Sequence, residues 1–418
     1  MSIDAMLVKE KSMTRAWVIT IIGSLFFFYS FIQANMMTPL NKSLLDYFSS
    51  SASGVAVLGA WFFYADVFFL LPAGLLLDRF SVKKIMLVNM ALVVMGTLLF
   101  AFSTSIIMAS FARFLSGIMM SFGLIACLKL ASFWLPANRM AIASSIVITI
   151  GMVGGMVAQT PITILINNFE WRGAVFAIAV LGAVVTFVLM AFVKMPSGVK
   201  EESTASQENV FVSLSKVMKL SQNWYAGLFT SLLNMPVAIL GALFGISYLT
   251  TTYNISDMQA ASIVSMLFLG MIIGSPFFGW FSDSLKVRKF PMLVGSSICL
   301  ILTLVLLNLN TTNVTLLYVL FLSIGFTSAA QVLGYPIIAE SNPSKISGTA
   351  LSLAAILIMG GGYGIGLPLV GKLLDRLTLN FSQTLAYKYA FLTMPIGIVV
   401  SMIMILFMKE TRCQSINK

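Results

Sequence analysis

The sequence predicts an all-α membrane protein whose twelve transmembrane helices form two pseudo-symmetric bundles of six helices. Three observations support this prediction. Hydrophobic residues make up 59% of the 418 residues and charged residues only 9%, which is far outside the range of soluble domains. Apolar runs of about 20 residues, long enough to cross the hydrocarbon core as helices, recur along the whole chain. An eleven-residue motif also occurs twice, half a chain apart.

The repeated motif lies at the same place in each half. Residues 74–84 read GLLLDRFSVKK and residues 279–289 read GWFSDSLKVRK, at an offset of 205 residues. Each copy lies where one apolar run ends and the next begins. GGMVAQTP at 154–161 and GGYGIGLP at 361–368 correspond in the same way, at an offset of 207. Internal duplication of this kind is typical of membrane transporters.

The order of apolar and polar segments gives the domain organisation. The polar stretch in the middle, which is rich in Ser, Glu and Lys, predicts a flexible linker. We therefore expect an N-terminal six-helix bundle at 1–194, a cytoplasmic linker at 195–221 and a C-terminal bundle at 222–418. The end of the linker, 210–220, is predicted to form a short interfacial helix with Lys216 and Lys219 on its wet side. The expected spans are 17–39, 54–77, 84–103, 106–131, 139–165, 171–194, 223–250, 258–280, 290–308, 314–339, 346–371 and 387–408.

The placement of the cations predicts the orientation. With a cytoplasmic N-terminus, 18 of the 25 Lys and Arg residues fall in cytoplasmic segments and 5 on the opposite side. Arg113 and Lys129 lie within spans. This bias predicts that both termini are cytoplasmic. It also explains the net charge of +11 by contact with anionic lipid, so no nucleic-acid partner is expected.

Several classes of function are disfavoured by what the sequence lacks. It contains no His, and its three cysteines form no CxxC pair, so we expect neither a metal site nor a disulfide. GGGYGIG at 360–366 lies within an apolar run and lacks the strand–turn–helix context of a nucleotide-binding loop. No nucleophile–base set is apparent. The sequence thus predicts a protein that is not an enzyme, has no catalytic residues and needs no cofactor.

Asp66 is the candidate proton-coupling residue. It lies about twelve residues from either end of the second span, near the middle of the membrane. A carboxylate at that depth costs about 2.5–3.5 kcal/mol on insertion scales, so it is expected to face a cavity or a partner. In a chain without His, proton carriage would fall to such a carboxyl group. The alternative is a structural role in an ion pair or hydrogen bond.

Arg113 and a group of buried amides are the candidate substrate-binding residues. A guanidinium can hold a carboxylate with two parallel hydrogen bonds. Arg113 could therefore bind a substrate carboxylate, pair with Asp66 or organise the N-terminal half, and the sequence does not decide among these. Any single amide can instead bond a neighbouring helix. The amides are Gln33, Asn35, Gln159, Asn234 and Gln331.

These motifs resemble the major facilitator superfamily along essentially the whole chain. The signature G-x-x-x-D-R-x-G-R-R/K is matched at Gly74, Asp78, Arg79 and Lys83, but Ser81 and Val82 depart from it. The second copy keeps Gly279, Asp283 and Arg288, whereas Ser284 replaces the signature Arg. A helix 4 pattern, R-x-x-x-G, is matched at Arg113 and Gly117, and Trp-Arg-Gly at 171–173 resembles the usual start of helix 6.

The resemblance implies a fold, a gate and a class of function. In this family the loop motifs close the cytoplasmic gate, and Glu340 at the end of the tenth span is a further candidate for a gate ion pair. RFLSGIMMSFGLIACLKLASFW at 113–134 resembles a branch of amino-acid and nucleoside transporters from intracellular bacterial pathogens. That implies a monomeric protein of the bacterial inner membrane that takes up a small polar metabolite, most plausibly an amino acid, with protons.

A proton-driven efflux antiporter for drugs or siderophores is the alternative function. Members of that type carry a Gly-Pro pair in helix 5. Here Thr160-Pro161 stands in its place, which disfavours this alternative without removing it.

Overall fold

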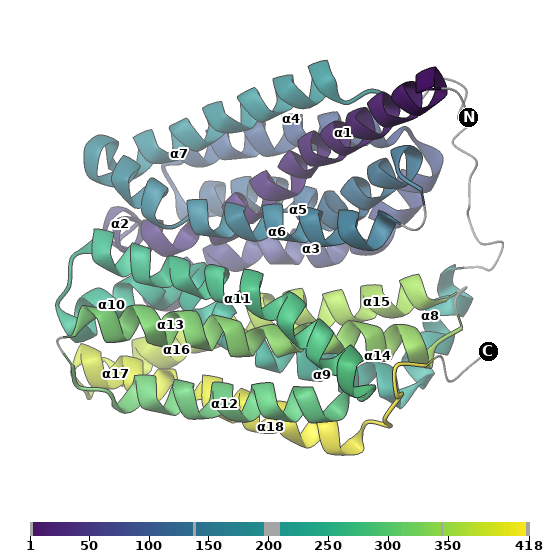
Figure 1. The fold of residues 1–418 in the computed structure, drawn as a ribbon. Coiled ribbons are helices and arrows are strands. Elements are labelled where there is room, and N and C mark those ends of the chain that lie inside the picture. Colours follow the sequence, from purple (N-terminus) through teal and green to yellow (C-terminus); the bar gives the residue numbers. More distant parts are fainter. Residues whose placement is uncertain (1–2, 137–138, 196–209, 312, 344–345, 415–418) are drawn as a thin grey trace.

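The computed structural model describes residues 3–136, 139–195, 210–311, 313–343 and 346–414. These residues are helical throughout, with no strand among them. Two sets of helices pack separately, one built from α1–α7 and the other from α8–α18 (Figure 1). The first set comprises α1 (Ile3–Asn35), α2 (Met37–Tyr47), α3 (Ala52–Arg79), α4 (Val82–Ala101), α5 (Ile106–Trp134), α6 (Met140–Val157) and α7 (Thr160–Phe192).

The second set contains more breaks, because three of its spans change helix type along their length. It comprises α8 (Val210–Lys219), α9 (Ser221–Leu233), the π-helix η2 (Val237–Phe244), α10 (Gly245–Tyr253), α11 (Asp257–Leu285), α12 (Lys289–Asn308), α13 (Val314–Ser328), the 3₁₀-helix η3 (Ala329–Leu333), α14 (Gly334–Ser341), α15 (Ser347–Ile356), the π-helix η4 (Leu357–Gly366), α16 (Leu367–Leu377), α17 (Gln383–Ala390) and α18 (Thr393–Phe407).

The predicted fold class is confirmed, with twelve spans in the described residues. Ten helical elements are long and apolar enough to cross a membrane. One of them, Ile142–Phe192, has 51 residues and leaves helical geometry at Glu170, where φ is 57°, so it supplies two spans. The bent pair Ser221–Leu233 and Val237–Tyr253, with an angle of 49°, supplies the remaining one.

Both ends of the described chain lie at the same end of the bundle, together with α8 (Figure 1). We call this end the terminal side, and the opposite end, which carries α2, α10 and α17, the far side. The linker prediction falls mostly on 196–209, which lie outside the described residues. Its last part forms α8 as expected, with Val217 buried and Lys216 and Lys219 exposed.

Corresponding glycines make the same close helix contact in each half, so the duplication extends to the packing of the helices. A Cβ on Gly117 of α5 would lie 2.1 Å from the main-chain oxygen of Phe62 in α3. A Cβ on Gly325 of α13 would lie 2.1 Å from the main-chain oxygen of Leu267 in α11. Only glycine permits helices to approach so closely. The R-x-x-x-G pattern therefore has a structural reason in the contact between α3 and α5.

The two halves meet along a seam to which each contributes a few helices. Helix α3 packs against η4 and α16, α6 packs against α11, and α2 packs against η2. The polar residues singled out in the sequence are distributed on both sides of this seam. The exact bundle boundaries at 194 and 222 stay a prediction.

Candidate substrate and coupling site

Arg113 is fully buried in the N-terminal half, where it binds the first predicted amide. Its Nη2 donates to the main-chain oxygen of Gln33 at 2.9 Å, and its Nη1 donates to Gln33 Oε1 at 3.4 Å. The guanidinium also lies over the ring of Phe62, 4.6 Å from the centroid. Its Nε has no hydrogen-bond partner among the described residues. The Nε–H group of a buried cation is thus left without an acceptor, which is costly unless one arrives.

Hydrogen bonds of Gln33 connect Arg113 to two other helices. Its Nε2 donates to Tyr29 Oη at 3.0 Å and to Thr97 Oγ1 at 2.8 Å. Tyr29 Oη in turn donates to the main-chain oxygen of Ile178 at 3.0 Å. The network joins α1, α4, α5 and α7. The sequence did not single out Tyr29 or Thr97, because aromatic and hydroxyl residues are common in every apolar run.

Asp66 lies one helical turn beyond this network on α3. At about 100° per residue, Asp66 projects about 40° from Phe62 and about 60° from Phe63, between the two. Phe62 contacts Arg113, and Phe63 stacks on Tyr363 of the other half. Asp66 is only 3% exposed. In the described part of the chain its carboxylate makes no hydrogen bond or ion pair.

Asp66 and Arg113 do not pair in this structure. No salt bridge joins them among the described residues, although α3 and α5 run in parallel and pack closely. Side chains in a helix lean toward its N-terminus, and both helices begin at the far side. The guanidinium of Arg113 therefore extends toward Gln33 and away from the level of Asp66.

A second polar cluster lies across the seam in the C-terminal half. Gln331 Nε2 donates to Asn234 Oδ1 at 3.0 Å, and Asn234 Nδ2 donates to Tyr363 Oη at 3.1 Å. The ring of Tyr363 stacks on that of Phe63 with centroids 4.4 Å apart. Asn234 and Gln331 are thus brought together as one group, and α3 links it to the Arg113 network through the adjacent residues Phe62 and Phe63.

The other two predicted amides lie elsewhere. Asn35 Nδ2 bonds the main-chain oxygen of Phe31 in its own helix at 2.9 Å. Gln159 Nε2 donates to the main-chain oxygen of Gly241 at 3.0 Å. Gln159 therefore joins the two halves, and neither amide belongs to the two clusters above.

The described hydrogen bonds between the halves lie in the far-side half of the bundle. Four N-terminal side chains donate to main-chain oxygens of the two π-helices. Asp375 of α16 accepts from the N–H groups of Ala52 and Ser53, at 2.8 and 3.0 Å, at the start of α3. The four side chains that donate to the π-helices are Thr38 and Gln159, which both donate to Gly241, Asn41, which donates to Leu243, and Tyr64, which donates to Gly364.

On the terminal side, the described ion pairs stay within the C-terminal half. Arg288 Nη1 binds Asp283 at 2.7 Å and its Nη2 binds Glu340 at 2.6 Å. The carboxylate of Glu410 accepts the N–H groups of Arg288 and Lys289, both at 2.9 Å. Glu340 thus forms an ion pair that joins α14 to the loop before α12 within one half, and its role in a gate stays a prediction. The sequence analysis missed Glu410, although an acid after the last span, among basic loops, is a visible signal.

In the described residues, the N-terminal copy of the motif makes fewer polar contacts than the C-terminal copy. Gly74 and Gly279 both have open space where a Cβ would lie, and Arg79 is exposed. Lys83 Nζ donates to the main-chain oxygen of Met190 at 2.8 Å. The side chain of Asp78 lies outside the described part of the structure. Among the described residues, no atom of the other half lies within 4 Å of a Cβ placed on either glycine.

Comparison with known proteins identifies the family. The family model of the Major Facilitator Superfamily matches residues 22–247 and 227–417, two overlapping matches that together span most of the chain. The chain belongs to this superfamily. It is 22% identical over 419 residues to the uncharacterized transporter YybO of Bacillus subtilis, with 94% of each chain covered. It is 24% identical to human monocarboxylate transporter 12, covering 76% of this chain and 68% of the relative.

A solved transporter structure has the same fold. A mutant of the nucleoside transporter NupG superposes with a TM-score of 0.78 at 14% identity, covering 93% of this chain and 99% of that one. The protein is therefore a multi-pass membrane transporter of the superfamily type.

Proposed function

We propose that this superfamily member is a secondary active transporter that takes up a small polar metabolite together with protons by alternating access. The substrate class that the site favours is a carboxylate-bearing metabolite, with an amino acid as the specific proposal. One chain carries out the transport cycle, in the inner membrane of a bacterium and with both termini in the cytoplasm.

The position of Asp66 carries the proposal of proton coupling. A carboxyl group buried without a partner is stable when it is neutral or when a cation approaches it. Asp66 lies between the faces of α3 that contact the two halves, so a relative movement of the halves changes its surroundings. Binding and release of a proton can thereby be linked to exposure on one side or the other.

Arg113 supports a carboxylate as the recognised group. Its Nε lacks a described partner, and Phe62 shields one face of the guanidinium from competing acceptors. A substrate carboxylate would satisfy that donor with a charge-assisted bond. The amide and phenol groups of Asn234, Gln331 and Tyr363 then suit the remaining polar atoms of the substrate. The name of the human relative, a monocarboxylate transporter, agrees with this substrate class.

The pattern of contacts supports alternating access. The described hydrogen bonds between the halves lie toward the far side, whereas the described ion pairs of the terminal side are internal to one half. With cytoplasmic termini, as the cation distribution predicts, this conformation is closed to the outside. The gate motifs at Gly74 and Gly279 would come into contact when the terminal side closes.

Uptake by purified protein in proteoliposomes with an imposed inward proton gradient tests the proposal. We expect a labelled amino acid to accumulate above its external concentration. Asp66→Asn is expected to keep counterflow exchange and to lose gradient-driven accumulation. Asp46→Asn, which changes an exposed carboxylate of α2, is the matched control and is expected to accumulate normally.

Two results would contradict the proposal. Full accumulation by the Asp66→Asn variant would remove this residue from coupling. Gradient-driven expulsion of dyes, with no uptake of any amino acid or other carboxylate, would favour the efflux antiporter instead.

A further inference from the structure

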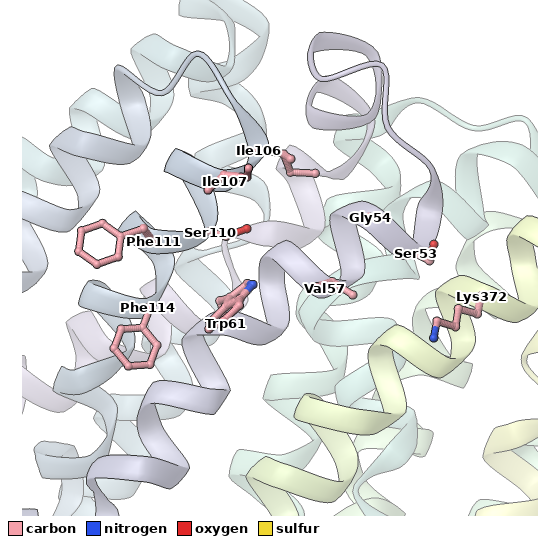
Figure 2. Close-up of a pocket in the computed structure, with 10 residues that line it drawn as sticks. All are labelled: Ser53, Gly54, Val57, Trp61, Ile106, Ile107, Ser110, Phe111, Phe114 and Lys372. Atoms are coloured by element: carbon pink, nitrogen blue, oxygen red, sulfur yellow. The ribbon is translucent and has the colours of Figure 1, made fainter.

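A groove opens on the side of the bundle at the far side, away from the two polar clusters. Its volume is about 600 Å³, and apolar residues provide most of its lining. Nine of the ten lining residues come from α3 and α5, and the tenth, Lys372, comes from α16 of the other half (Figure 2). The groove therefore crosses the seam between the halves.

The cationic residue and the aromatic residues lie toward opposite ends of the groove, with Ile106 and Ile107 beside the cationic end. Lys372 and Ser53 lie at one end, at the level where α3 begins. Trp61 and Phe114 lie eight residues further along α3 and α5 than Ser53 and Ile106. That corresponds to a depth of about 12 Å at 1.5 Å per residue. The polar end thus lies at the membrane boundary, and the aromatic end lies within the hydrocarbon core.

Lys372 supplies the charge at the polar end. It is exposed, and within the described ranges its ammonium makes no hydrogen bond or ion pair. The nearest carboxylate in sequence, Asp375, has both oxygens engaged by the N–H groups of Ala52 and Ser53. A lone cation above an apolar groove at the headgroup level matches a phospholipid, with its phosphate on the cation and an acyl chain below.

We propose that this groove binds one anionic phospholipid, whose headgroup phosphate contacts Lys372 and whose acyl chain lies along Val57 and Trp61. Because Lys372 belongs to one half and the rest of the groove to the other, the lipid joins the halves across the seam. Gly371 packs here against α3, where its Cβ would lie 2.8 Å from the Cα of Ser53. The lipid therefore favours the conformation that is closed on the far side, since opening would part its two attachment points.

Spin-labelled lipids measure the selectivity of the groove. The full-length protein is placed in nanodiscs of phosphatidylcholine doped with spin-labelled phosphatidylglycerol or spin-labelled phosphatidylcholine, and the immobilised fraction is recorded. We expect phosphatidylglycerol to associate about fivefold more strongly, the effect of one Lys near an anionic headgroup. Lys372→Gln should abolish that preference. Lys42→Gln, which removes an exposed far-side cation outside the groove, should retain it.

A second variant tests the contribution of the groove independently of the charge of Lys372. Ser110→Phe fills the groove and leaves Lys372 in place, so it should reduce the immobilised fraction of both lipids. Unchanged selectivity in Lys372→Gln would overturn the phosphate contact, and unchanged immobilisation in Ser110→Phe would overturn the groove as the lipid site. Equal immobilisation of the two lipids by the unmodified protein would show that the groove takes acyl chains without recognising the headgroup, and would also overturn the proposal.

The conformational consequence has its own measurement. Distances between spin labels on the far-side ends of α2 and α10 should show a larger far-side-closed population in nanodiscs with phosphatidylglycerol than in phosphatidylcholine alone. Lys372→Gln should remove this dependence on lipid, and Lys42→Gln should keep it. A population that does not change with lipid composition would contradict the link between the lipid and the seam.

Discussion

The ring of Phe63 stacks on the ring of Tyr363 across the seam, with centroids 4.4 Å apart and an angle of 29° between the planes. The next residue before it, Phe62, lies under the guanidinium of Arg113. Two adjacent residues of α3 thus contact the polar networks of both halves. A movement of α3 along its axis would alter both contacts together, so this helix links the two polar networks to the relative position of the halves.

Tyr363→Phe tests whether the C-terminal cluster binds substrate. The change keeps the stacking on Phe63 and removes the hydroxyl that accepts from Asn234. On the function proposed above this hydroxyl also bonds the substrate, and one such substrate bond is worth about 1 kcal/mol. We expect the substrate concentration for half-maximal uptake to rise about fivefold while the maximal rate stays within twofold. Tyr389→Phe on exposed α17 is the control, and an unchanged half-maximal concentration in Tyr363→Phe would argue against a binding role.

Asp375→Asn should weaken the closure of the far side. Asp375 caps the start of α3 from the opposite half, and a carboxylate at a helix N-terminus is stabilised by the N–H groups and the helix dipole. We expect the far-side-closed population to fall about fivefold relative to the open one, as measured by spin-label distances between α2 and α10. Asp46→Asn on the same side should leave the population unchanged. The same population in Asp375→Asn as in the unmodified protein would show that this cap does not hold the far side closed.

The twelve spans were predictable because lipid imposes length and apolarity on every helix. The R-x-x-x-G pattern was recognised at Gly117, but its counterpart Gly325, which makes the equivalent contact 208 residues later, was not predicted. The helix types within spans were not predictable. The π-helices η2 and η4 have the same apolar composition as the α-helices beside them, and composition does not reveal which helical hydrogen-bond pattern is adopted.

The partners of the site residues were harder to predict than the residues themselves. Arg113 and Gln33 were both identified as candidates, but their mutual bond depends on the rotation of α1 relative to α5, which a single sequence does not fix. Asp66 was expected to face a cavity or a partner. The contacts of the flanking Phe62 and Phe63, with Arg113 in one half and Tyr363 in the other, became visible only when both neighbours of α3 were placed.

Gly117→Ala and Gly279→Ala should behave differently, although each adds one methyl group. The Cβ at Gly117 would collide with main-chain atoms of Phe62, which cannot move without shifting α3. We expect a loss of about 2 kcal/mol in stability and a lower unfolding temperature in detergent. Gly279→Ala has open space in this conformation and should unfold at the normal temperature. It should nevertheless slow transport if Gly279 closes the gate in the opposite conformation, and normal transport would refute that gate role.

Glu410→Gln should lower stability in a way that depends on pH. Burial opposes the ionisation of Glu410, but the N–H groups of Lys289, Arg288, Arg412 and Thr411 bind its carboxylate and together lower its pKa below 4.5. A folded-state pKa below the unfolded value contributes stability that is fully present above the unfolded pKa and is lost as the pH falls through the folded pKa.

At pH 7 we expect Glu410→Gln to cost about 1 kcal/mol, the typical value of a helix cap, because Arg288 and Lys289 begin α12. The difference in unfolding temperature from the unmodified protein should shrink steadily below pH 4.5, since the protonated carboxyl and the amide are then equivalent caps. Glu170→Gln, which changes an exposed acid on the far side, is the control and should show no difference in unfolding temperature at pH 7 or at pH 3. If the Glu410→Gln difference stays constant from pH 7 to pH 3, the charge of Glu410 does not stabilise this cap.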